Sequence, residues 1–358
     1  MAYFRQRGKT WSFTLEGGTD TNGRNQIVRS GFKDEATARA ACEKLEEEIR
    51  KGKRVKFQTV ESFATTYYEK VVKGQVEDST YINQWIWLKN HIFPKLGKKK
   101  IDKLDIDDIQ TFYSDLQTEG VSKGTIKNVG MVLKKVFKEA EGKRVITFNP
   151  AKFVKIPAYK PPIMNVWSLA AVKKFTQVAV DVEYYPIYIL GLYSGMRIGE
   201  MLSLEITDFD LPDRYVYISK TLKHSKERGL YVKKPKTDNS ARRVKLPKFV
   251  TDILEEHISK IPKGINIVFH NYGAYQYPSE IYRRFKADCK DLGMPSIRIH
   301  DLRHTHVTML FSLPKDQRPN AKTVADRIGD TVQTVLTTYA HVLKDMQDEI
   351  ADTLDFIQ

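Results

Sequence analysis

Four short stretches in the C-terminal half hold the side chains best suited to chemistry. They read YSGMRIGEMLSL (193–204), KPKTDNSARRV (234–244), HDLRHTH (300–306) and RIGDTVQTVLTTYAHV (327–342). Arg197 and Glu200 stand one helical turn apart, so they share a helix face, and His300 and Arg303 have the same spacing. Tyr339 is the one tyrosine of its stretch, and its hydroxyl group could act as a nucleophile once activated.

Together these residue types suit chemistry on a phosphate. Two arginines can clamp one phosphate through forked donors, and fixed cations stabilise a pentacovalent transition state. Lys236, in a turn between two strand-like segments, could protonate a departing oxygen, and a histidine could act as acid or base. A tyrosine hydroxyl with a pKa near ~10 is a poor nucleophile unless cations lower that pKa or a base takes its proton.

Each residue also has a plainer interpretation. An Arg–Glu pair on a helix is commonly a surface ion pair, a lysine in a turn is commonly solvated, and Tyr339 alone would be structural. His300 and His304 have the spacing of a metal pair, but no third ligand has suitable local spacing. Neither a carboxylate-rich magnesium site nor a Gly-rich nucleotide loop is found, so we expect chemistry without a metal or other cofactor.

Composition narrows the class of partner. The chain has 358 residues, enough for two or three domains, and a formal net charge of +15 with a pI of about 9.4. Such a charge favours nucleic acid as partner, although a basic surface can simply keep a protein soluble. The two cysteines, Cys42 and Cys289, are far apart and suit a reducing cytoplasm. No signal segment and no membrane span are expected.

The first fifty residues predict a small sheet and one helix. TWSFTLEG (10–17) and NQIVRSGF (25–32) alternate as strands do around an Asn-Gly turn signal. The following segment, 33–53, is expected to be a helix with Ala36, Ala40, Leu45 and Ile49 on one face, ending at Gly52. Such a unit could lie in a DNA groove or be a small solvated domain.

A helical domain and a larger mixed domain are expected next. From Thr59 to about Ala140 the pattern predicts four helices, the second stopped by Pro94 and Gly97 and the third ending at Gly120. Its basic side, suited to phosphate or simply solvated, would be formed by Lys98, Lys99, Lys100, Lys123, Lys127, Lys134 and Lys135. Residues 149–167, rich in proline, are expected to form a linker without regular structure. We therefore predict a multidomain fold: a small α+β domain (1–55), an all-α domain (58–157) and a mixed, mainly α domain (165–358).

The order of these motifs resembles the tyrosine recombinase family, the integrases of temperate phages and conjugative transposons. The resemblance is carried by GMRIGE, then a lysine in a strand turn before SARRV, then HDLRHT, then IGD and TTYAHV. It covers roughly residues 165–345 with specific motifs. The helical region 59–157 resembles the family's core-site-binding domain, and the first 55 residues resemble its arm-site-binding domain, both through weaker motifs.

The resemblance implies a role for each matching residue. Arg197 and Arg303 would clamp the scissile phosphate, and Tyr339 would attack it to form a 3′-phosphotyrosyl link. Lys236, favoured over its neighbour Lys234, would be the general acid for the leaving 5′ oxygen. His300 would be a proton-transfer partner, and Glu200 would support the site. Because the link conserves the bond energy, ATP would not be needed.

Asp330 departs from the family pattern, which usually has histidine or tryptophan nine residues before the nucleophile. Three interpretations are open. Asp330 accepts a hydrogen bond from a catalytic arginine or histidine; it points away while another donor substitutes; or it is an altered residue that weakens activity. An ionised carboxylate near a phosphate should repel it.

These observations predict a site-specific DNA recombinase that integrates and excises a mobile element in the cytoplasm of a bacterial host, at the nucleoid. The resemblance implies double-stranded DNA with core and arm sites, a homotetramer on synapsed DNA, an excision factor and a host DNA-bending protein as partners. The segment 344–358 would reach a neighbouring subunit or pack on its own domain. Two alternatives are a type IB topoisomerase-like activity and a non-catalytic DNA-binding regulator with a decayed site.

Overall fold

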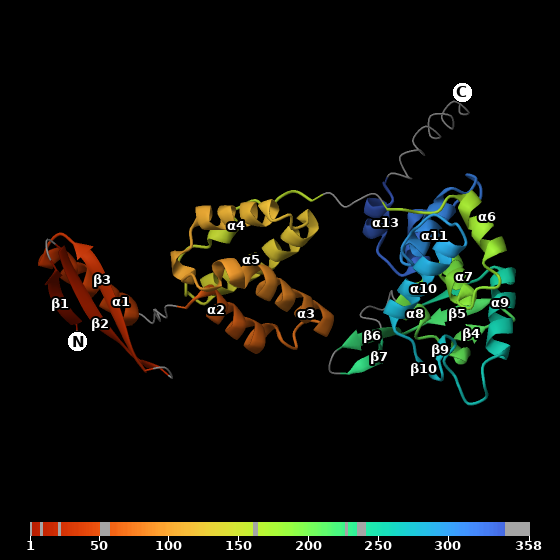
Figure 1. Cartoon of the computed structure of the whole chain (residues 1–358), viewed down its shortest axis with the longest axis horizontal. Helices are drawn as coiled ribbons and strands as arrows, with labels where there is room; N and C mark the ends of the chain where they lie inside the picture. The colour runs from red at the N-terminus through yellow and green to blue at the C-terminus, as the bar shows by residue number, and fades with distance from the viewer. Residues whose placement is uncertain are drawn as a thin grey trace, which may run out of the picture. The chain divides into compact units, whose positions relative to one another are not determined.

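The computed structural model divides the chain into two compact units, Met1–Pro161 and Pro162–Gln358 (Figure 1). Each unit is described by itself. The structure describes residues 2–7, 10–20, 23–50, 58–159, 164–225, 228–234 and 241–340. The predicted linker is therefore described on both sides of residues 160–163, and the segment 344–358 lies outside the described residues.

The N-terminal part of the first unit is an antiparallel sheet of three strands with one helix. The elements are β1 (Ala2–Arg7), β2 (Thr10–Asp20), β3 (Gly23–Phe32) and α1 (Glu35–Arg50), and the strand order is β1-β2-β3. The sheet has one strand more than the sequence predicted. Phe13 and Leu15 alternate toward the helix and pack with Cys42 and Leu45, which gives this part its own small core.

The predicted apolar face of α1 was wrong for its two alanines and is confirmed for Leu45. Ala36 and Ala40 are exposed, whereas Ala38, Cys42 and Leu45 are buried, and the side chain of Ile49 lies outside the described ones. The four alanines of this helix do not share one face, so their spacing alone does not select it. The larger side chains Cys42 and Leu45 decide which face turns to the sheet, because they bury more apolar surface. The Asn-Gly turn includes Asn22, which lies outside the described residues.

The rest of the first unit is helical. Its elements are α2 (Val60–Tyr67), η1 (Tyr68–Val72), α3 (Asp78–Trp87), η2 (Leu88–Gly97), η3 (Ile101–Lys103), α4 (Ile106–Thr118), α5 (Lys123–Gly142) and η4 (Pro150–Lys152). Three helix starts are capped by side chains that accept backbone N–H bonds, those of Thr59, Asp105 and Ser122. Along α5 the residues Ile126, Leu133 and Phe137 are fully buried on one stripe that faces the other helices.

Two boundaries in this helical part differ from the prediction. The second helix ends at Gly97, as predicted, but Pro94 does not stop it, because the chain continues through Pro94 with π-helical geometry from Leu88 onward. The predicted linker also begins later than Asn149. Ala151 and Val154 are buried in the helical core, and Pro150 starts a short 3-10 helix.

The second unit combines helices with three small sheets. Its elements are α6 (Leu169–Val178), α7 (Tyr185–Ser194), α8 (Ile198–Met201), η5 (Ile206–Asp208), β4 (Phe209–Asp210), β5 (Tyr215–Ile218), β6 (Thr221–Ser225), β7 (Gly229–Lys233), β8 (Arg242–Lys245), α9 (Lys248–Ser259), β9 (His270–Asn271), β10 (Ala274–Tyr275), α10 (Pro278–Asp291), α11 (Asp301–Phe311), α12 (Ala321–Ile328) and α13 (Val332–Thr338). The sheets are β4-β5-β8, β6-β7 and β10-β9, all antiparallel.

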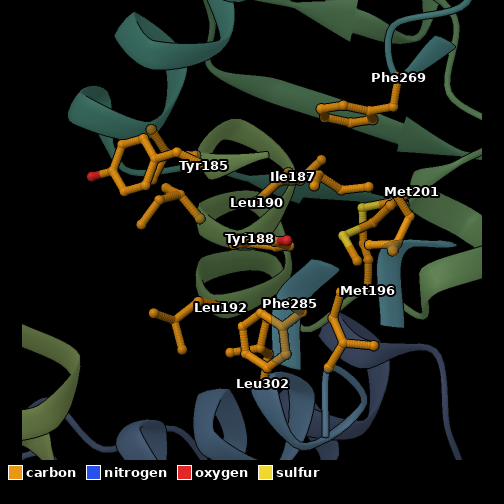
Figure 2. Close-up of a cluster of buried hydrophobic side chains, with 14 of the residues drawn as sticks. Tyr185, Ile187, Tyr188, Leu190, Leu192, Met196, Met201, Phe269, Phe285 and Leu302 are labelled. Carbon is orange, nitrogen blue, oxygen red and sulfur yellow. The ribbon is translucent and has the colours of Figure 1, made fainter. Parts of the chain in front are cut away.

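Helix α7 is the centre of the second unit. It is apolar on all sides, and Figure 2 shows its side chains packing toward Phe269 on one side and toward Phe285 and Leu302 on the other. In Figures 1 and 2 it lies between the strands and α11. A helix that is apolar all round is stable only when it is enclosed. It therefore holds the residues that follow it, including Arg197, in a fixed position.

The predicted fold class is confirmed: the chain is multidomain, with a helical domain followed by a mainly helical unit that contains small sheets. Among the helices of the described residues, none has the length and apolar character needed to cross a membrane.

Truncation of Phe285 should destabilise the second unit strongly. Its ring is 1% exposed and packs against Tyr188, with ring centroids 4.9 Å apart. We expect Phe285→Ala to cost about 3–5 kcal/mol, because it removes buried surface and leaves a cavity. Hydrogen exchange of peptides from α7 and α10 in the full chain measures the loss. Tyr272→Ala is the control, since Tyr272 is fully exposed; equal protection in both variants would contradict the prediction.

Candidate active site

Two arginines from distant segments meet at the carboxylate of Asp330. Arg197 stands directly before α8, and Arg303 lies on α11. Each donates from its Nη2 to Oδ2 of Asp330, in both cases at 2.9 Å. The two donor nitrogens are therefore no farther apart than the sum of those distances. One negatively charged oxygen already sits between the two cations, so this is a place built to hold an anion.

The carboxyl group of Asp330 is held in its ionised form. Burial by itself raises its pKa, but a backbone N–H bond from Thr331 and the charges of Arg197 and Arg303 outweigh burial and hold the pKa below its ordinary value. Asp330 thus accepts hydrogen bonds from both arginines, as the first of the three interpretations predicted.

The end of α12 supplies further oxygens to the same cations. The carbonyl of Ile328 accepts a bond from Nη1 of Arg303, and the carbonyl of Gly329 accepts one from Nη1 of Arg197 at 3.1 Å. The last carbonyls of a helix have no partner within the helix and carry partial negative charge. Arginine side chains therefore satisfy them, and the helix end helps to neutralise the arginines.

Arg303 is the more deeply buried of the two arginines. Its side chain is 4% exposed, and its Nη1 also donates to the carbonyl of Gly195 at 2.8 Å. Burial and the nearby charge of Arg197 lower its pKa to about 10, so it remains charged at neutral pH. Gly195 has φ +69°, and a Cβ there would lie 2.8 Å from the His306 ring, so glycine is required at this turn.

Glu200 is a buried partner of two arginines. Its side chain accepts the backbone N–H of Arg197 at 3.0 Å and a bond from Nη1 of Arg197 at 3.1 Å. It also accepts a bond from Nη2 of Arg242 at 2.8 Å, and both of these side chains are almost completely buried. Burial raises the pKa of Glu200, but Arg242 and Arg197 together more than offset burial, so the pKa lies below its ordinary value.

Arg242 joins strand β8 to the end of α12. Its Nε donates to the carbonyl of Arg327 at 2.9 Å, next to the carbonyls bound by the other two arginines. Gly329 has φ +66°, and a Cβ on it would lie 2.6 Å from Nη1 of Arg242. Only glycine fits this close approach, which explains the Gly between Ile328 and Asp330.

A buried histidine orients Arg327. The Nε of Arg327 donates to Nε2 of His306 at 3.0 Å, and Nδ1 of His306 lies 3.0 Å from the carbonyl of Leu192. Since arginine can only donate, Nε2 is unprotonated and Nδ1 carries the hydrogen. Burial lowers the pKa of His306 to about 3, which keeps the ring neutral.

Tyr339 lies at the end of α13 and is buried, with 3% of the residue exposed. Its ring packs against Phe311, and its hydroxyl lies 2.7 Å from Nδ1 of His304. Burial raises the pKa of Tyr339 above its ordinary value, although the charge of Arg303 acts in the opposite direction. Burial thus works against ionisation of this hydroxyl, so a base that takes its proton would assist attack.

His300 stands at the start of α11 beside His304. The two rings meet edge to face with centroids 5.1 Å apart. An open cleft borders His300, lined among others by Tyr282, Lys286 and Arg298. His300 is exposed there, so its imidazole can reach a ligand that approaches from solvent.

The predicted lysine cannot be placed. Lys236 lies outside the described residues, while Lys234, its rival, follows the end of β7 and is exposed. Among the other predicted residues, hydrogen bonds join Arg197, Glu200, Arg303 and Asp330 directly. His300 stands at the start of α11, the helix that carries Arg303. Tyr339 contacts His304, the residue that follows Arg303 on the same helix.

Two residues of the site were not assigned from the sequence. Arg242 had a signal, because SARRV places two arginines on alternating faces of a strand and one of them must point inward. His304 was considered only as half of a metal pair. Its contact with Tyr339 joins residues on different helices, and spacing along one helix does not reveal such a contact.

Removal of Arg242 should destabilise the second unit far more than removal of its neighbour. We expect Arg242→Ala to cost about 3–5 kcal/mol, because Glu200 would keep a buried charge without its main partner. Arg243→Ala is the matched control: Arg243 is exposed and lies over the Tyr215 ring, so about 0.5–1 kcal/mol is expected. Chemical denaturation followed by hydrogen exchange of α8 and α12 measures both. Similar losses in the two variants would show that the Glu200 pair contributes little.

Comparison with known proteins agrees with this geometry. Residues 169–346 match the phage integrase family, and residues 59–117 match the N-terminal SAM-like domain of phage integrases. The chain is 29% identical to the ICEBs1 integrase of Bacillus subtilis strain 168, covering 96% of this chain and 95% of that protein. It is 26% identical to a XerC-like tyrosine recombinase of Caldanaerobacter subterraneus subsp. tengcongensis, covering 99% and 97%.

Solved structures share the fold. The Tn1549 transposon integrase in complex with a circular intermediate DNA aligns with a TM-score of 0.71 at 21% identity, covering 83% of this chain and 99% of that one. A lambda integrase tetramer bound to a Holliday junction aligns with a TM-score of 0.59 at 15% identity, covering 92% and 95%. With the matched domains and the convergence of Arg197 and Arg303 on one anion position, the chain belongs to the phage integrase family of tyrosine recombinases.

Proposed function

We propose that this chain is a site-specific DNA recombinase that cleaves and rejoins DNA through a 3′-phosphotyrosyl intermediate to integrate and excise a mobile element. The observation that carries the proposal is the meeting of Arg197 and Arg303 at a single carboxylate oxygen, 2.9 Å from each. Two guanidinium groups held this close would repel each other without an anion. The forked donors of arginine recognise phosphate as they recognise carboxylate, so the same pair can bind a phosphodiester group.

The arginines keep donors for such a ligand. A guanidinium group has five N–H donors. In Arg303 the contacts among the described residues use both hydrogens of Nη1 and one of Nη2, and the same holds for Arg197. The Nε hydrogen and one Nη2 hydrogen of each therefore remain for phosphate oxygens. The carboxylate of Asp330 does not have to leave before a phosphate binds.

In the proposed reaction, the Tyr339 oxygen forms a bond to phosphorus while the bond to the 5′ oxygen breaks. Arg197 and Arg303 stabilise the negative charge that grows on the phosphate oxygens. By resemblance, Lys236 gives a proton to the departing 5′ oxygen, and His300 assists from the start of α11. The phosphotyrosyl link conserves the bond energy, so a 5′ hydroxyl of another strand can reverse the step and join new partners.

The other domains are proposed to bind DNA. The helical domain, 58–157, would contact the core sites, and the N-terminal sheet domain, 1–55, would contact the arm sites. Exposed lysines of the helical domain, such as Lys98 and Lys123, suit contacts with phosphate. A tetramer on synapsed DNA is supported by the lambda integrase tetramer bound to a Holliday junction. We also propose that an excision factor and a DNA-bending protein take part in the reaction. The segment 344–358 is proposed to dock on a neighbouring subunit.

A covalent adduct tests the reaction. With a nicked suicide DNA substrate drawn from the ends of the source element, we expect the parent protein to form a protein–DNA adduct that survives boiling in detergent. Tyr339→Phe lacks the nucleophilic oxygen and should form none, while it binds the same DNA equally well. Denaturing gels measure the adduct, and fluorescence anisotropy measures binding. DNA binding without any adduct from the parent would instead favour a non-catalytic DNA-binding regulator.

Asp330 is proposed to hold the two arginines in their catalytic positions. Asp330→Asn keeps the shape of the side chain but removes the charge that compensates two cations. We expect cleavage to slow about tenfold or more, which corresponds to ~1.4 kcal/mol in the barrier. Single-turnover cleavage of the suicide substrate measures the rate.

The matched control for this prediction is Asp326→Asn. Asp326 lies on the same helix, α12, but its exposed carboxylate pairs only with Lys322 among the described residues. Its cleavage rate should stay within about twofold of the parent, since exposed pairs contribute little. A clear gain in rate from Asp330→Asn, or from Asp330→His, would show that the carboxylate opposes the phosphate and that Asp330 is an altered, weakening residue.

A further inference from the structure

The hydroxyl of Tyr339 does not point to solvent but meets a histidine on another helix. Its oxygen lies 2.7 Å from Nδ1 of His304, and the two rings are tilted by 55° with centroids 5.7 Å apart. His304 is fixed on α11, in the residue directly after Arg303. The histidine that contacts the proposed nucleophile and the phosphate-binding Arg303 are therefore held by the same helix, while Tyr339 itself comes from the end of α13.

The contact with His304 bears on how the Tyr339 hydroxyl can lose its proton. A tyrosine hydroxyl is a weak nucleophile until its proton is removed. Burial, together with the carboxylates of Asp330 and Asp301, raises the pKa of Tyr339, and only Arg303 among the groups that act on it lowers that pKa. A base in direct contact with the hydroxyl would assist attack by taking the proton, and Nδ1 of His304 is the ring nitrogen placed for this at 2.7 Å.

His304 is neutral in the DNA-free chain and so has room for a proton, but its low pKa makes it a weak base there. Burial first, and then the neighbouring His300, lower its pKa to about 4, while Asp301 acts in the opposite direction and Arg303 and Arg298 act in the same one. Above pH 4 its ring is thus mostly neutral and one ring nitrogen has a free lone pair. A bound phosphodiester adds negative charge nearby, which favours the protonated ring and so strengthens the base.

We propose that His304 is a catalytic residue whose Nδ1 accepts the proton of Tyr339 during strand cleavage; this rests on the proposed function. As the bond between the tyrosine oxygen and phosphorus forms, the hydroxyl proton moves to Nδ1, which makes His304 a cation. The bond from phosphorus to the 5′ oxygen breaks, and that oxygen takes its proton from the general acid, assigned to Lys236. In rejoining, a 5′ hydroxyl forms the bond to phosphorus and gives its proton to the general acid that was deprotonated in cleavage, assigned to Lys236. The bond from phosphorus to the tyrosine oxygen breaks, and the protonated His304 returns the proton to that oxygen.

Two variants of His304 separate proton transfer from positioning. In His304→Asn the side-chain oxygen can lie near the place of Nδ1 and accept the bond from Tyr339, but an amide cannot take the proton. His304→Ala loses both functions. We expect both variants to form the adduct about 100- to 10,000-fold more slowly than the parent at pH 7, the range typical for loss of a general base.

The pH dependence of the cleavage rate distinguishes loss of the base from loss of folded protein. Without His304, hydroxide must remove the proton, so the ratio of variant to parent rate should rise about tenfold for each pH unit between pH 6 and pH 9. The parent retains its base throughout this range, because neutral His304 is lost only as the pH falls toward about 4. A smaller fraction of folded protein would scale the rates but would not change this slope.

The matched control is His270→Asn in the same unit. Nδ1 of His270 also accepts a hydrogen bond, from the N–H of Gly273 at 3.2 Å, and an asparagine oxygen can replace it. This variant should cleave within about twofold of the parent at every pH. DNA binding by each variant is measured by anisotropy on the same substrate.

The outcomes distinguish this inference from the proposed function. If the parent forms the adduct and His304→Asn equals it in rate and pH profile, His304 only positions the tyrosine and the inference is overturned, while the recombinase function stands. Absence of an adduct from the parent overturns both. Nitrogen NMR of the DNA-free full chain is a second test: an unprotonated Nδ1 on His304 supports the inference, and a protonated Nδ1 that donates to Tyr339 overturns it.

Discussion

The meeting of three arginines at the end of α12 is the interaction on which the second unit depends. Arg197, Arg242 and Arg303 bring three positive charges into a small and mostly buried space, where repulsion is stronger than in water. Glu200, Asp330 and the last carbonyls of α12 supply the compensating negative charge. Burying these guanidinium groups costs free energy, and hydrogen bonds from their N–H groups to these oxygens offset that cost.

The contacts that stabilise the end of α12 also hold the arginines of the candidate active site. The four residues 327–330 bind side chains from α11, from β8 and from the turn before α8, so displacing one of them would move several arginines together. Gly329 permits the close approach of Arg242, and Asp330 ends the segment with a full charge. The carboxylate at position 330 is then understandable as part of this charge balance, and it leaves donors on both arginines for a phosphate.

The arginines stay charged in this site, whereas Tyr339 has to lose a proton from a buried hydroxyl group. Burial against Phe311 fixes its ring but makes its hydroxyl harder to ionise. The structure meets this by placing the neutral ring of His304 against the hydroxyl and Arg303 one residue before it on the same helix. One rigid helix, held against the apolar α7, thus sets both the phosphate-binding cation and the contact of the nucleophile.

The sequence by itself determined what depends on neighbours along the chain. The four helices of the helical domain and the order of the four motifs were readable, and with them the fold class and the family. Only the tertiary structure decided contacts between distant residues: the bond of Asp330 to two arginines, the burial of Arg242 against Glu200 and the pairing of His304 with Tyr339. The tertiary structure also decided which face of α1 is buried and that η2 of the helical domain continues through Pro94. The physical reason is that spacing along a helix or strand fixes a face, whereas the partner of that face depends on how the elements pack.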